Sequence, residues 1–329
     1  MEVRRQYPVY LYALERALAR LKPDDPAIRQ VKDEIYRQEA GYSGELASDQ
    51  YVQRTRLPGS VRVLTDLQIE LGEGESVQID TLILTPRGAW IIESKRYRGM
   101  LRYCHSPKRI ERVDDDGLAI AFPCPILQLE TQIRAMEGWL ESRGIELPVN
   151  GTVAFASHNV WEGLPDAAPI IPVREIPFYL ENEFRIKPDC LDAQQFNQLV
   201  RLLEREGLHK EWTPICKRFG INPNHLKRGF LCPDCDAVLA RATERTVHCT
   251  GCGHEGLRDY WQLILDWFLL IHPTINNAQL RTFARLTGKQ SANRILRMYE
   301  LDKGGASTRT VYSLNPYRDL DAMYEVSLY

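Results

Sequence analysis

The amino-acid sequence predicts an α/β protein with a mixed central sheet. Two patterns support this prediction: apolar residues recur at helical spacing in some segments, and shorter strand-like runs lie between turn residues in others. From the second helix onward the elements read α, β, β, β, α, β, an order typical of the α/β class. Helices are expected at 9–21, 27–39 and 126–140, and strands at 61–71, 77–84, 89–95 and 149–156.

Turn residues separate these elements. Pro23-Asp24-Asp25-Pro26 divides the first helical pattern into two helices, and Pro86-Arg87-Gly88 predicts a turn between two strands. A further helical pattern covers residues 191–206. Beyond it the sequence becomes irregular and basic, so we place a domain boundary near residue 205.

Length and composition indicate a soluble protein of several domains. The 329 residues exceed the usual size of a single core, and 44% hydrophobic and 26% charged residues are ordinary for a globular chain. No secretory signal pattern and no membrane-spanning apolar run is evident, which predicts a cytoplasmic protein without a membrane partner. The expected parts are a helical lead-in (1–39), an α/β domain (40–205), a linker (206–229), a cysteine module (230–258) and a C-terminal helical domain (259–329).

Two acidic residues and a lysine lie on strands joined by the predicted turn. Residues i and i+2 of a strand share a face, so Glu93 and Lys95 project together. If the turn closes an antiparallel hairpin, Asp80 lies close to Glu93 on the neighbouring strand. A hard cation such as Mg²⁺ or Mn²⁺ removes the repulsion between such carboxylates, and a nearby lysine suits phosphodiester hydrolysis. Alone, a Glu-x-Lys pair is more often a solvated surface ion pair.

Four motifs occur in order along this part of the chain. They are Gly41-Tyr42-Ser43-Gly44-Glu45, Gln78-Ile79-Asp80, Glu93-Ser94-Lys95 followed by Tyr97-Arg98-Gly99, and Pro125-Ile126-Leu127-Gln128. Together they resemble the nuclease-related domain family, NERD, a branch of the PD-(D/E)xK restriction-endonuclease-like superfamily. The corresponding family motifs are Gly-x-x-Gly-Glu at a helix start, Gln-Ile-Asp, Glu-x-Lys and Pro-x-x-Gln. The resemblance covers roughly residues 38 to 160, and Thr81 stands where the family often has histidine.

The resemblance implies a fold, an activity and a set of site residues. The fold is a restriction-endonuclease-like core, in which helices flank a mixed sheet, and the activity is a Mg²⁺- or Mn²⁺-dependent nuclease. Glu45, Asp80 and Glu93 are the implied metal ligands. Lys95 is implied to orient the attacking water, and Gln128 is implied to face the site.

A basic stretch follows the Glu-x-Lys motif. Between residues 93 and 112 seven basic residues stand against two acidic ones, a local charge of +5. Such a stretch is expected to face a polyanion, and Arg96 and Arg98 are the candidate nucleic-acid contacts within it.

The cysteine module predicts a zinc ribbon. Cys232 and Cys235 form one Cys-x-x-Cys pair, Cys249 and Cys252 form another, and four thiolates complete a structural Zn²⁺ site. The alternative is a set of free thiols. Gly251 and Gly253 are expected to allow positive φ angles, and His248 and His254 are interpreted as bystanders.

The C-terminal segment resembles a winged helix-turn-helix. Helices are expected at 277–286 and 291–299, followed by a hairpin at 302–313. In this interpretation Lys289, Arg294 and Arg297 reach a nucleic-acid groove, and Arg309 meets phosphate on the wing. Short helical hairpins of this kind also serve as protein-packing elements.

The leading hypothesis is therefore a nuclease acting on DNA, with its C-terminal parts binding nucleic acid, a protein partner or a second copy of the chain. The alternatives are a nuclease-fold protein that has lost activity and binds nucleic acid or regulates, and a scaffold that uses the ribbon for protein contacts.

Overall fold

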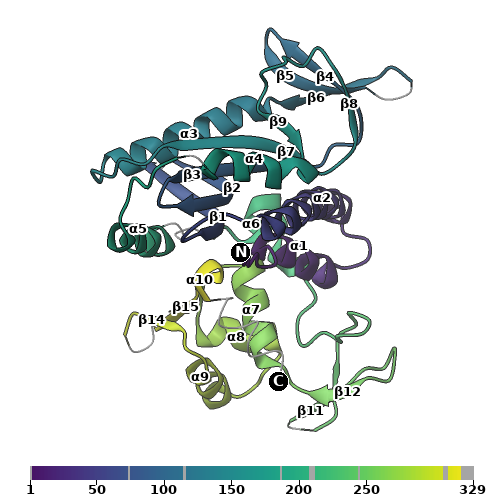
Figure 1. Cartoon of the computed structure of the whole chain (residues 1–329). Helices are drawn as coiled ribbons and strands as arrows, with labels where there is room; N and C mark the ends of the chain where they lie inside the picture. The colour runs from purple at the N-terminus through teal and green to yellow at the C-terminus, as the bar shows by residue number, and fades with distance from the viewer. Residues whose placement is uncertain are drawn as a thin grey trace. The chain divides into compact units, whose positions relative to one another are not determined.

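The computed structural model describes residues 2–72, 75–113, 116–185, 187–206, 212–243, 245–306 and 310–319 (Figure 1). Contacts divide the chain into two units. One comprises residues 1–6 and 39–209, and the other comprises residues 7–38 and 210–329. The N-terminal 38 residues are thus shared between the two units.

The first unit is built on a mixed five-stranded sheet, which confirms the predicted class. Its strand order is β1-β2-β3-β7-β9. The first three strands pair antiparallel, and β3, β7 and β9 pair parallel. The strands are β1 (Arg62–Gly72), β2 (Glu75–Thr85), β3 (Gly88–Lys95), β7 (Val149–Phe155) and β9 (Ile170–Pro172).

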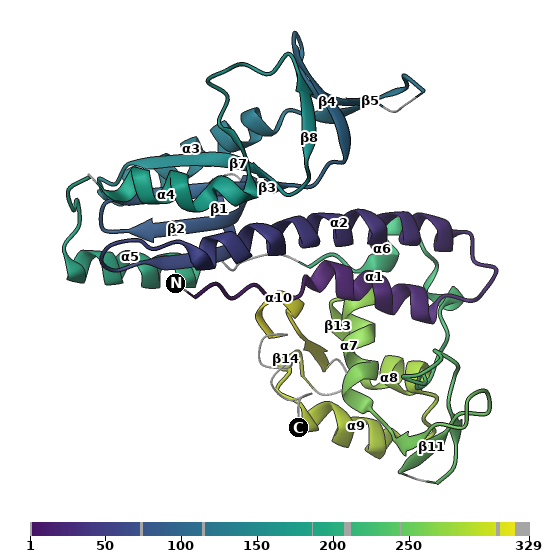
Figure 2. The ribbon, with the colours of Figure 1, turned by 45° about the vertical axis from the view of Figure 1, so that its right-hand side comes forward.

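Helices cover both faces of this sheet. Helices α3 (Pro125–Glu141) and α5 (Ala193–Glu206) share a buried cluster with one face, and α4 (Ile176–Arg185) shares another cluster with the opposite face. Figure 2 shows α4 in front of the sheet and α3 behind it. Apolar side chains of β3 alternate between the two clusters, as expected for a strand buried on both faces.

Helix α2 (Ala27–Arg54) is longer than the sequence patterns predict. The expected end at residue 39 is wrong, and the Gly-x-x-Gly-Glu motif lies inside the helix instead of at its start. Glycines at 41 and 44 each cost helix stability of roughly 1 kcal/mol relative to alanine. Ser48 and Val52, one turn apart, are fully buried on the face that packs in the first unit. This tertiary packing outweighs the local propensity.

A second, four-stranded sheet was not predicted. Its order is β6-β5-β4-β8, and it consists of β4 (Gly99–His105), β5 (Lys108–Val113), β6 (Ala119–Pro123) and β8 (Asn159–Glu162). Leu101, Tyr103 and Ile110 point into the main core, while charged residues alternate with them. The sheet therefore contains most of the basic stretch. Part of the stretch's charge is paired within the sheet, since Arg102 contacts Glu162 and Arg109 contacts Glu111.

Gly151 on β7 lets α3 approach the sheet closely. A Cβ atom at this position would lie 2.7 Å from Leu129 Cδ1 and 2.8 Å from the Ile91 carbonyl oxygen. Only glycine avoids both contacts without a shift of backbone. The packing of α3 against β3 and β7 thus depends on Gly151. This packing positions the candidate site, because α3 carries two of its side chains.

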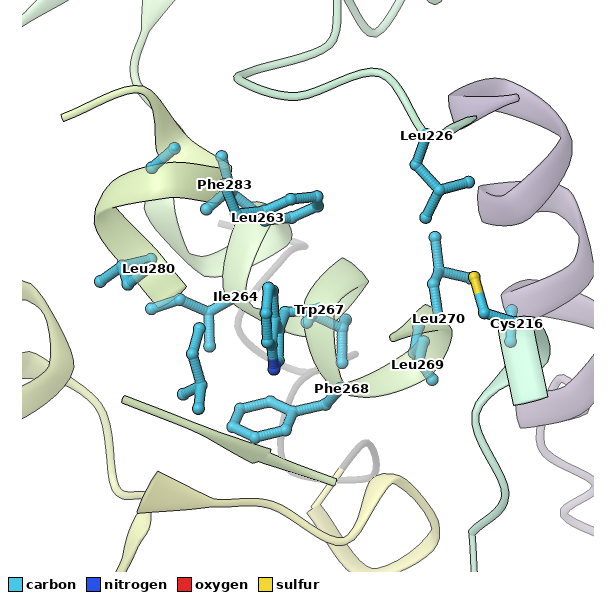
Figure 3. Close-up of a cluster of buried hydrophobic side chains, with 14 of the residues drawn as sticks. Cys216, Leu226, Leu263, Ile264, Trp267, Phe268, Leu269, Leu270, Leu280 and Phe283 are labelled. Carbon is cyan, nitrogen blue, oxygen red and sulfur yellow. The ribbon is translucent and has the colours of Figure 1, made fainter. Parts of the chain in front are cut away.

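The second unit is organised around α7 (Tyr260–Leu270), in which every residue from Leu263 to Leu270 is buried. Figure 3 shows Trp267 and Phe268 of α7 in a cluster with Leu280 and Phe283 of α8. The surrounding helices are α1 (Val9–Arg20), α6 (Ile215–Phe219), α8 (Asn277–Ala284) and α9 (Lys289–Met298), with α10 (Pro316–Asp319) near the end of the described chain. None of the described helices is long and apolar enough to span a membrane.

Two small sheets complete this unit. One has the order β10-β11-β12 and the other β13-β15-β14. Helices α8 and α9 precede β14 and β15, the order expected of the winged-helix-like segment. Arg309 lies outside the described residues. The strands are β10 (Ala240–Arg241), β11 (Thr246–His248), β12 (Glu255–Leu257), β13 (Thr274–Ile275), β14 (Asp302–Gly304) and β15 (Val311–Ser313).

A buried ion network ties α1 to α7 within the second unit. Asp266 is fully buried and accepts hydrogen bonds from Arg16 at 2.8 Å and from Arg20 at 2.5 Å. Arg20, also buried, donates in addition to the carbonyl oxygens of Lys227 and Gly229. The neighbouring guanidinium groups outweigh the effect of burial and lower the pKa of Asp266. The network joins residues about 250 positions apart in the sequence.

Candidate active site and cysteine cluster

The register of the β2–β3 hairpin brings Asp80 and Glu93 to neighbouring positions. The last pair of this ladder is Thr81 with Ile92, and the next residues along each strand are Asp80 and Glu93. Asp80 accepts a hydrogen bond from the backbone N–H of Ser94 at 3.0 Å. The two strands separate at this point, which leaves both carboxyl groups at the end of the paired region.

Glu93 and Lys95 lie on the face of β3 that α3 covers. Lys95 Nζ donates to Glu93 Oε1 at 2.5 Å and to Gln128 Oε1 at 3.1 Å. Gln132, one helical turn after Gln128, donates to Glu93 Oε2 at 2.5 Å and to the Gln78 carbonyl oxygen. Both carboxylate oxygens of Glu93 therefore accept hydrogen bonds, one from Lys95 and one from Gln132. Gln132 was missed in the sequence interpretation, although its i+4 spacing from Gln128 places both side chains on one helix face.

Glu45 reaches the same region from α2. The close approach of α2 to the end of β3 depends on Gly44, because a Cβ atom there would lie 3.1 Å from Arg96 Cβ. Ser48, on the same helix, accepts a 2.7 Å hydrogen bond from Ser94 Oγ of β3. These contacts bring Glu45 toward the hairpin although it is 35 residues from Asp80 in the sequence.

An arginine from the N-terminal segment joins the acidic group. Arg5 is 1% exposed and contacts the carboxylates of Glu45 at 2.9 Å, Asp49 at 2.7 Å and Asp66 at 3.3 Å. It also donates to Thr81 Oγ1 at 2.7 Å. Asp49, Asp66 and Arg5 were absent from the sequence-based set of site residues. Nothing in the spacing of position 5 signals a contact with residues 40 or more positions away.

The site carries an excess of negative charge. Five carboxyl groups (Glu45, Asp49, Asp66, Asp80 and Glu93) stand against two cations (Arg5 and Lys95), so full ionisation gives 2 − 5 = −3. Burial raises the pKa of Glu45 to about 7. The neighbouring carboxylates also raise this pKa, whereas the positive charge of Arg5 lowers it. Burial and then the charge of Glu93 raise the pKa of Asp80 well above its usual range. Protons thus occupy part of the site near neutral pH.

The charge on Lys95 is favoured by its partner. Burial lowers the pKa of this amine, but the Glu93 carboxylate outweighs burial and raises it overall. Lys95 therefore remains an ammonium group at neutral pH. At this site the Lys95 amine can donate hydrogen bonds and supply a fixed positive charge.

The donor set fits a hard divalent cation. Clustered carboxylate oxygens are the ligands that Mg²⁺ and Mn²⁺ prefer, and the surplus negative charge is the electrostatic condition for binding one. The buried Oε1 atom of Gln132, close to Glu93, has no hydrogen-bond partner among the described residues. The oxygens of Glu45, Asp80 and Glu93 do not form a group within 4.8 Å of one another, as the cysteines do. Glu45 and Glu93 instead each direct an oxygen at a cation of the chain.

The candidate nucleic-acid residues are exposed. Arg96 and Arg98 follow β3 directly, and Arg96 donates a hydrogen bond to Ser43 Oγ on α2. Lys289, Arg294 and Arg297 are exposed on α9 in the second unit. The two groups belong to different units.

The four cysteines of the second unit converge as the sequence predicts. Their Sγ atoms all lie within 4.8 Å of one another, and the pairs Cys232–Cys252 and Cys235–Cys249 are 3.5 Å apart. A tetrahedral site with Zn–S bonds of roughly 2.3 Å separates sulfurs by about 3.8 Å. The cluster is therefore compatible with a zinc ribbon.

The two Cys-x-x-Cys turns have matching backbone geometry. In the first, the N–H of Asp236 donates to the Cys232 carbonyl oxygen, and in the second the N–H of Gly253 donates to that of Cys249. Both donors have positive φ, 56° for Asp236 and 81° for Gly253. Gly251, which was also expected to have positive φ, is not among the positive-φ residues. A Cβ atom at Gly251 would lie 3.7 Å from the Cys249 sulfur, an ordinary contact distance.

Backbone amides prepare one of these thiols for metal binding. The N–H groups of Cys252 and Gly251 stabilise the thiolate of Cys249 and lower its pKa to about 6. The thiolate is the form that binds zinc. His254, interpreted as a bystander from the sequence, pairs with Asp234 at 2.9 Å and lies within 4.8 Å of the Cys232 sulfur.

Comparison with known proteins places the acidic site within a recognised family. The family model of the nuclease-related domain, NERD, matches residues 40–156. This range includes Glu45, Asp80, Glu93, Lys95 and Gln128, and it ends just beyond β7. Searches of curated proteins and of solved structures found no match. Residues 40–156 of the chain thus match the nuclease-related domain, NERD, and the acidic site lies within the matched region.

Proposed function

We propose that this protein is a divalent-metal-dependent nuclease that hydrolyses phosphodiester bonds in DNA. The observation that carries the proposal is the group of five carboxyl groups around two cations where β2 and β3 separate, with raised pKa values at Glu45 and Asp80. A bound Mg²⁺ or Mn²⁺ relieves this repulsion. The nuclease-related domain family supports the same class of chemistry.

In this proposal Glu45, Asp80 and Glu93 hold the cation. When bound, Mg²⁺ or Mn²⁺ polarises a phosphoryl oxygen and lowers the pKa of water. Lys95 acts as a donor because its amine stays protonated. Glu93 and Gln128 take two of its three N–H groups among the described residues, and the third orients the attacking water toward phosphorus. Gln132 fixes Glu93, and Gln128 fixes Lys95.

The cysteine cluster is proposed to hold a structural Zn²⁺. Four thiolates fill the coordination sphere, so the metal has no open position for catalysis. The free state of all eight cysteines fits a reducing compartment, and we propose the cytoplasm. The ribbon and the exposed Lys289, Arg294 and Arg297 of α9 are proposed to aid the binding of nucleic acid, of a protein partner or of a second copy of the chain.

Binding of Mn²⁺ at the acidic site will strengthen as pH rises from 6 to 8. Below a pKa of about 7, Glu45 carries a proton that competes with the cation, and the raised pKa of Asp80 acts in the same direction. Release of one proton changes the dissociation constant roughly tenfold per pH unit below that pKa. Calorimetric titration at pH 6, 7 and 8 measures the effect. An affinity that does not change with pH contradicts this account, and Asp80→Asn controls for binding elsewhere.

The purified chain will contain about one equivalent of zinc, and Cys249→Ser will lose it. The remaining three thiols cannot complete a closed tetrahedral site. Elemental analysis after dialysis measures the zinc content. Cys190→Ser is the matched control, because Cys190 is an exposed thiol outside the cluster, and it will retain the metal. A wild-type chain with four reactive thiols and no zinc after growth in zinc-containing medium opposes the ribbon assignment.

A cleavage assay tests the proposed activity. The full chain is incubated with plasmid, linear and single-stranded DNA and with RNA, in Mg²⁺, Mn²⁺ or EDTA. Cleavage of DNA that requires the divalent cation and is lost in Asp80→Asn supports the proposal. DNA binding without cleavage under any of these conditions favours a nuclease-fold protein that has lost activity. Cleavage of RNA alone overturns the choice of DNA as substrate.

A further inference from the structure

Arg5 has every N–H group of its guanidinium engaged. Nε and Nη2 bind the two oxygens of Asp49, and Nη1 binds Glu45 and Asp66. Nη2 also donates to the Asp80 carbonyl oxygen at 2.9 Å and to Thr81 Oγ1 at 2.7 Å. Only 1% of the Arg5 side chain is exposed, so this arginine belongs to the protein interior and not to the surface.

These contacts join three separate elements at the candidate site. Glu45 and Asp49 belong to α2, Asp66 to β1, and Asp80 and Thr81 to β2. Because guanidinium is planar and rigid, its bonds fix direction as well as distance, which a lysine ammonium does not. Arg5 therefore links the Glu45 carboxylate directly to the Asp80 backbone.

The strand that Arg5 holds is irregular at that point. Ile79 and Leu82 pack into the same cluster although they are three residues apart, whereas a regular strand places residues an even number apart on one face. On the paired strand Asp66 has a φ of 55°, a conformation that non-glycine residues rarely adopt. Asp66 lies between Thr65 and Leu67, whose partners are Thr81 and Ile79. Such local departures need surrounding contacts to persist, and Arg5 supplies them.

We propose that Arg5 is a positioning residue of the nuclease site, which holds the Glu45 carboxylate and the Asp80 backbone in a fixed relation for the binding of one divalent cation. The inference rests on the proposed function. It extends the site beyond the family match at residues 40–156 to the N-terminal segment. It also gives Thr81 a role, since its hydroxyl is an acceptor for Arg5 in a buried position.

The test compares Mn²⁺ affinity across variants of the full, zinc-loaded chain. Arg5→Lys keeps the charge but cannot form the planar fork, and we expect a dissociation constant 10- to 100-fold higher, the usual effect of losing a side chain that orients a metal ligand. Arg5→Ala creates space for added methylguanidinium, which is expected to recover part of the affinity. Arg4→Ala is the matched control, because Arg4 is 82% exposed and pairs only with Glu2 among the described side chains.

A second variant keeps the proposal testable if Arg5→Ala does not fold. Asp49→Asn leaves Glu45, Asp80 and Glu93 intact but weakens the carboxylate that anchors Arg5, so Mn²⁺ affinity is expected to fall in the same direction by a smaller factor. Thermal unfolding of each variant is recorded alongside. Loss of thermal stability with wild-type Mn²⁺ affinity in both Arg5→Lys and Asp49→Asn overturns the positioning role.

The outcomes for the two proposals are separate. If the wild-type chain binds no Mn²⁺, the proposed function fails at its metal site and the role of Arg5 falls with it. If the wild-type chain binds Mn²⁺ and Arg5→Lys binds it equally well, only the role of Arg5 is overturned. Weaker binding in Arg5→Lys that methylguanidinium restores in Arg5→Ala supports both.

Discussion

Replacing Lys95 with alanine will lower the rate of DNA cleavage by roughly 10²- to 10⁴-fold, the range observed when a donor or proton-transfer group is removed from a reaction centre. Among the described residues of the site, only Lys95 both contacts Glu93 and retains an N–H group that can bind a water or a phosphoryl oxygen. Its loss leaves the carboxylates in place. We therefore expect Mn²⁺ binding to persist while single-turnover cleavage nearly stops.

This combination distinguishes a chemical role from a structural one. Asp80→Asn is expected to lose both Mn²⁺ binding and cleavage, whereas Lys95→Ala loses cleavage only. Lys187→Ala serves as the control, because Lys187 pairs with Glu183 in the same unit and away from the site. Cleavage by Lys95→Ala within threefold of wild type contradicts the assigned role.

Replacing Asp266 with alanine will destabilise the second unit by about 3–5 kcal/mol, the usual cost of removing one partner from a buried ion pair. Arg20 is buried with this carboxylate, and Arg16 is largely enclosed. Without Asp266, two guanidinium groups lose their counter-charge in a region of low dielectric. Hydrogen exchange of the α7 amides measures the loss as a lower free energy of opening.

An exposed ion pair in the same unit provides the comparison. Arg37 contacts Glu34 one helical turn away and is 66% exposed. Its replacement by alanine is expected to change stability by at most about 0.5 kcal/mol, because surface ion pairs are solvated and screened. A change of less than 1 kcal/mol in Asp266→Ala shows that the network does not hold α1 to α7 as described.

The hairpin and its acidic face could be predicted from the sequence for identifiable reasons. Alternating apolar residues on both sides of Pro86-Arg87-Gly88 indicate two paired strands, and the period of two places Glu93 and Lys95 together. A short turn restricts the register, so Asp80 falls beside Glu93. The cysteine pairs were equally predictable, because the spacing of two residues within each pair is set by the metal they suit.

Other parts of the structure depend on contacts that no local pattern records. Arg5 sits in an ordinary N-terminal segment, and its partners lie 40 to 76 residues away. The second sheet was missed because its strands are short and carry many charges on their outer face. The helical position of Glu45 was misplaced because the family motif predicts a helix start at Gly41-Tyr42-Ser43-Gly44-Glu45, whereas these residues lie inside α2. Burial of Ser48 and Val52 keeps the helix intact through both glycines.

In the proposed site, carboxylates from α2, β2 and β3 bind one hard cation beside Lys95. Diffraction from a crystal of the full chain soaked in Mn²⁺, with anomalous data collected to locate the ion, tests it most directly. The expected result is one Mn²⁺ with oxygens of Glu45, Asp80 and Glu93 at roughly 2.0–2.2 Å. Saturating Mn²⁺ that leaves these oxygens without an ion, or an ion bound only at other residues, contradicts it.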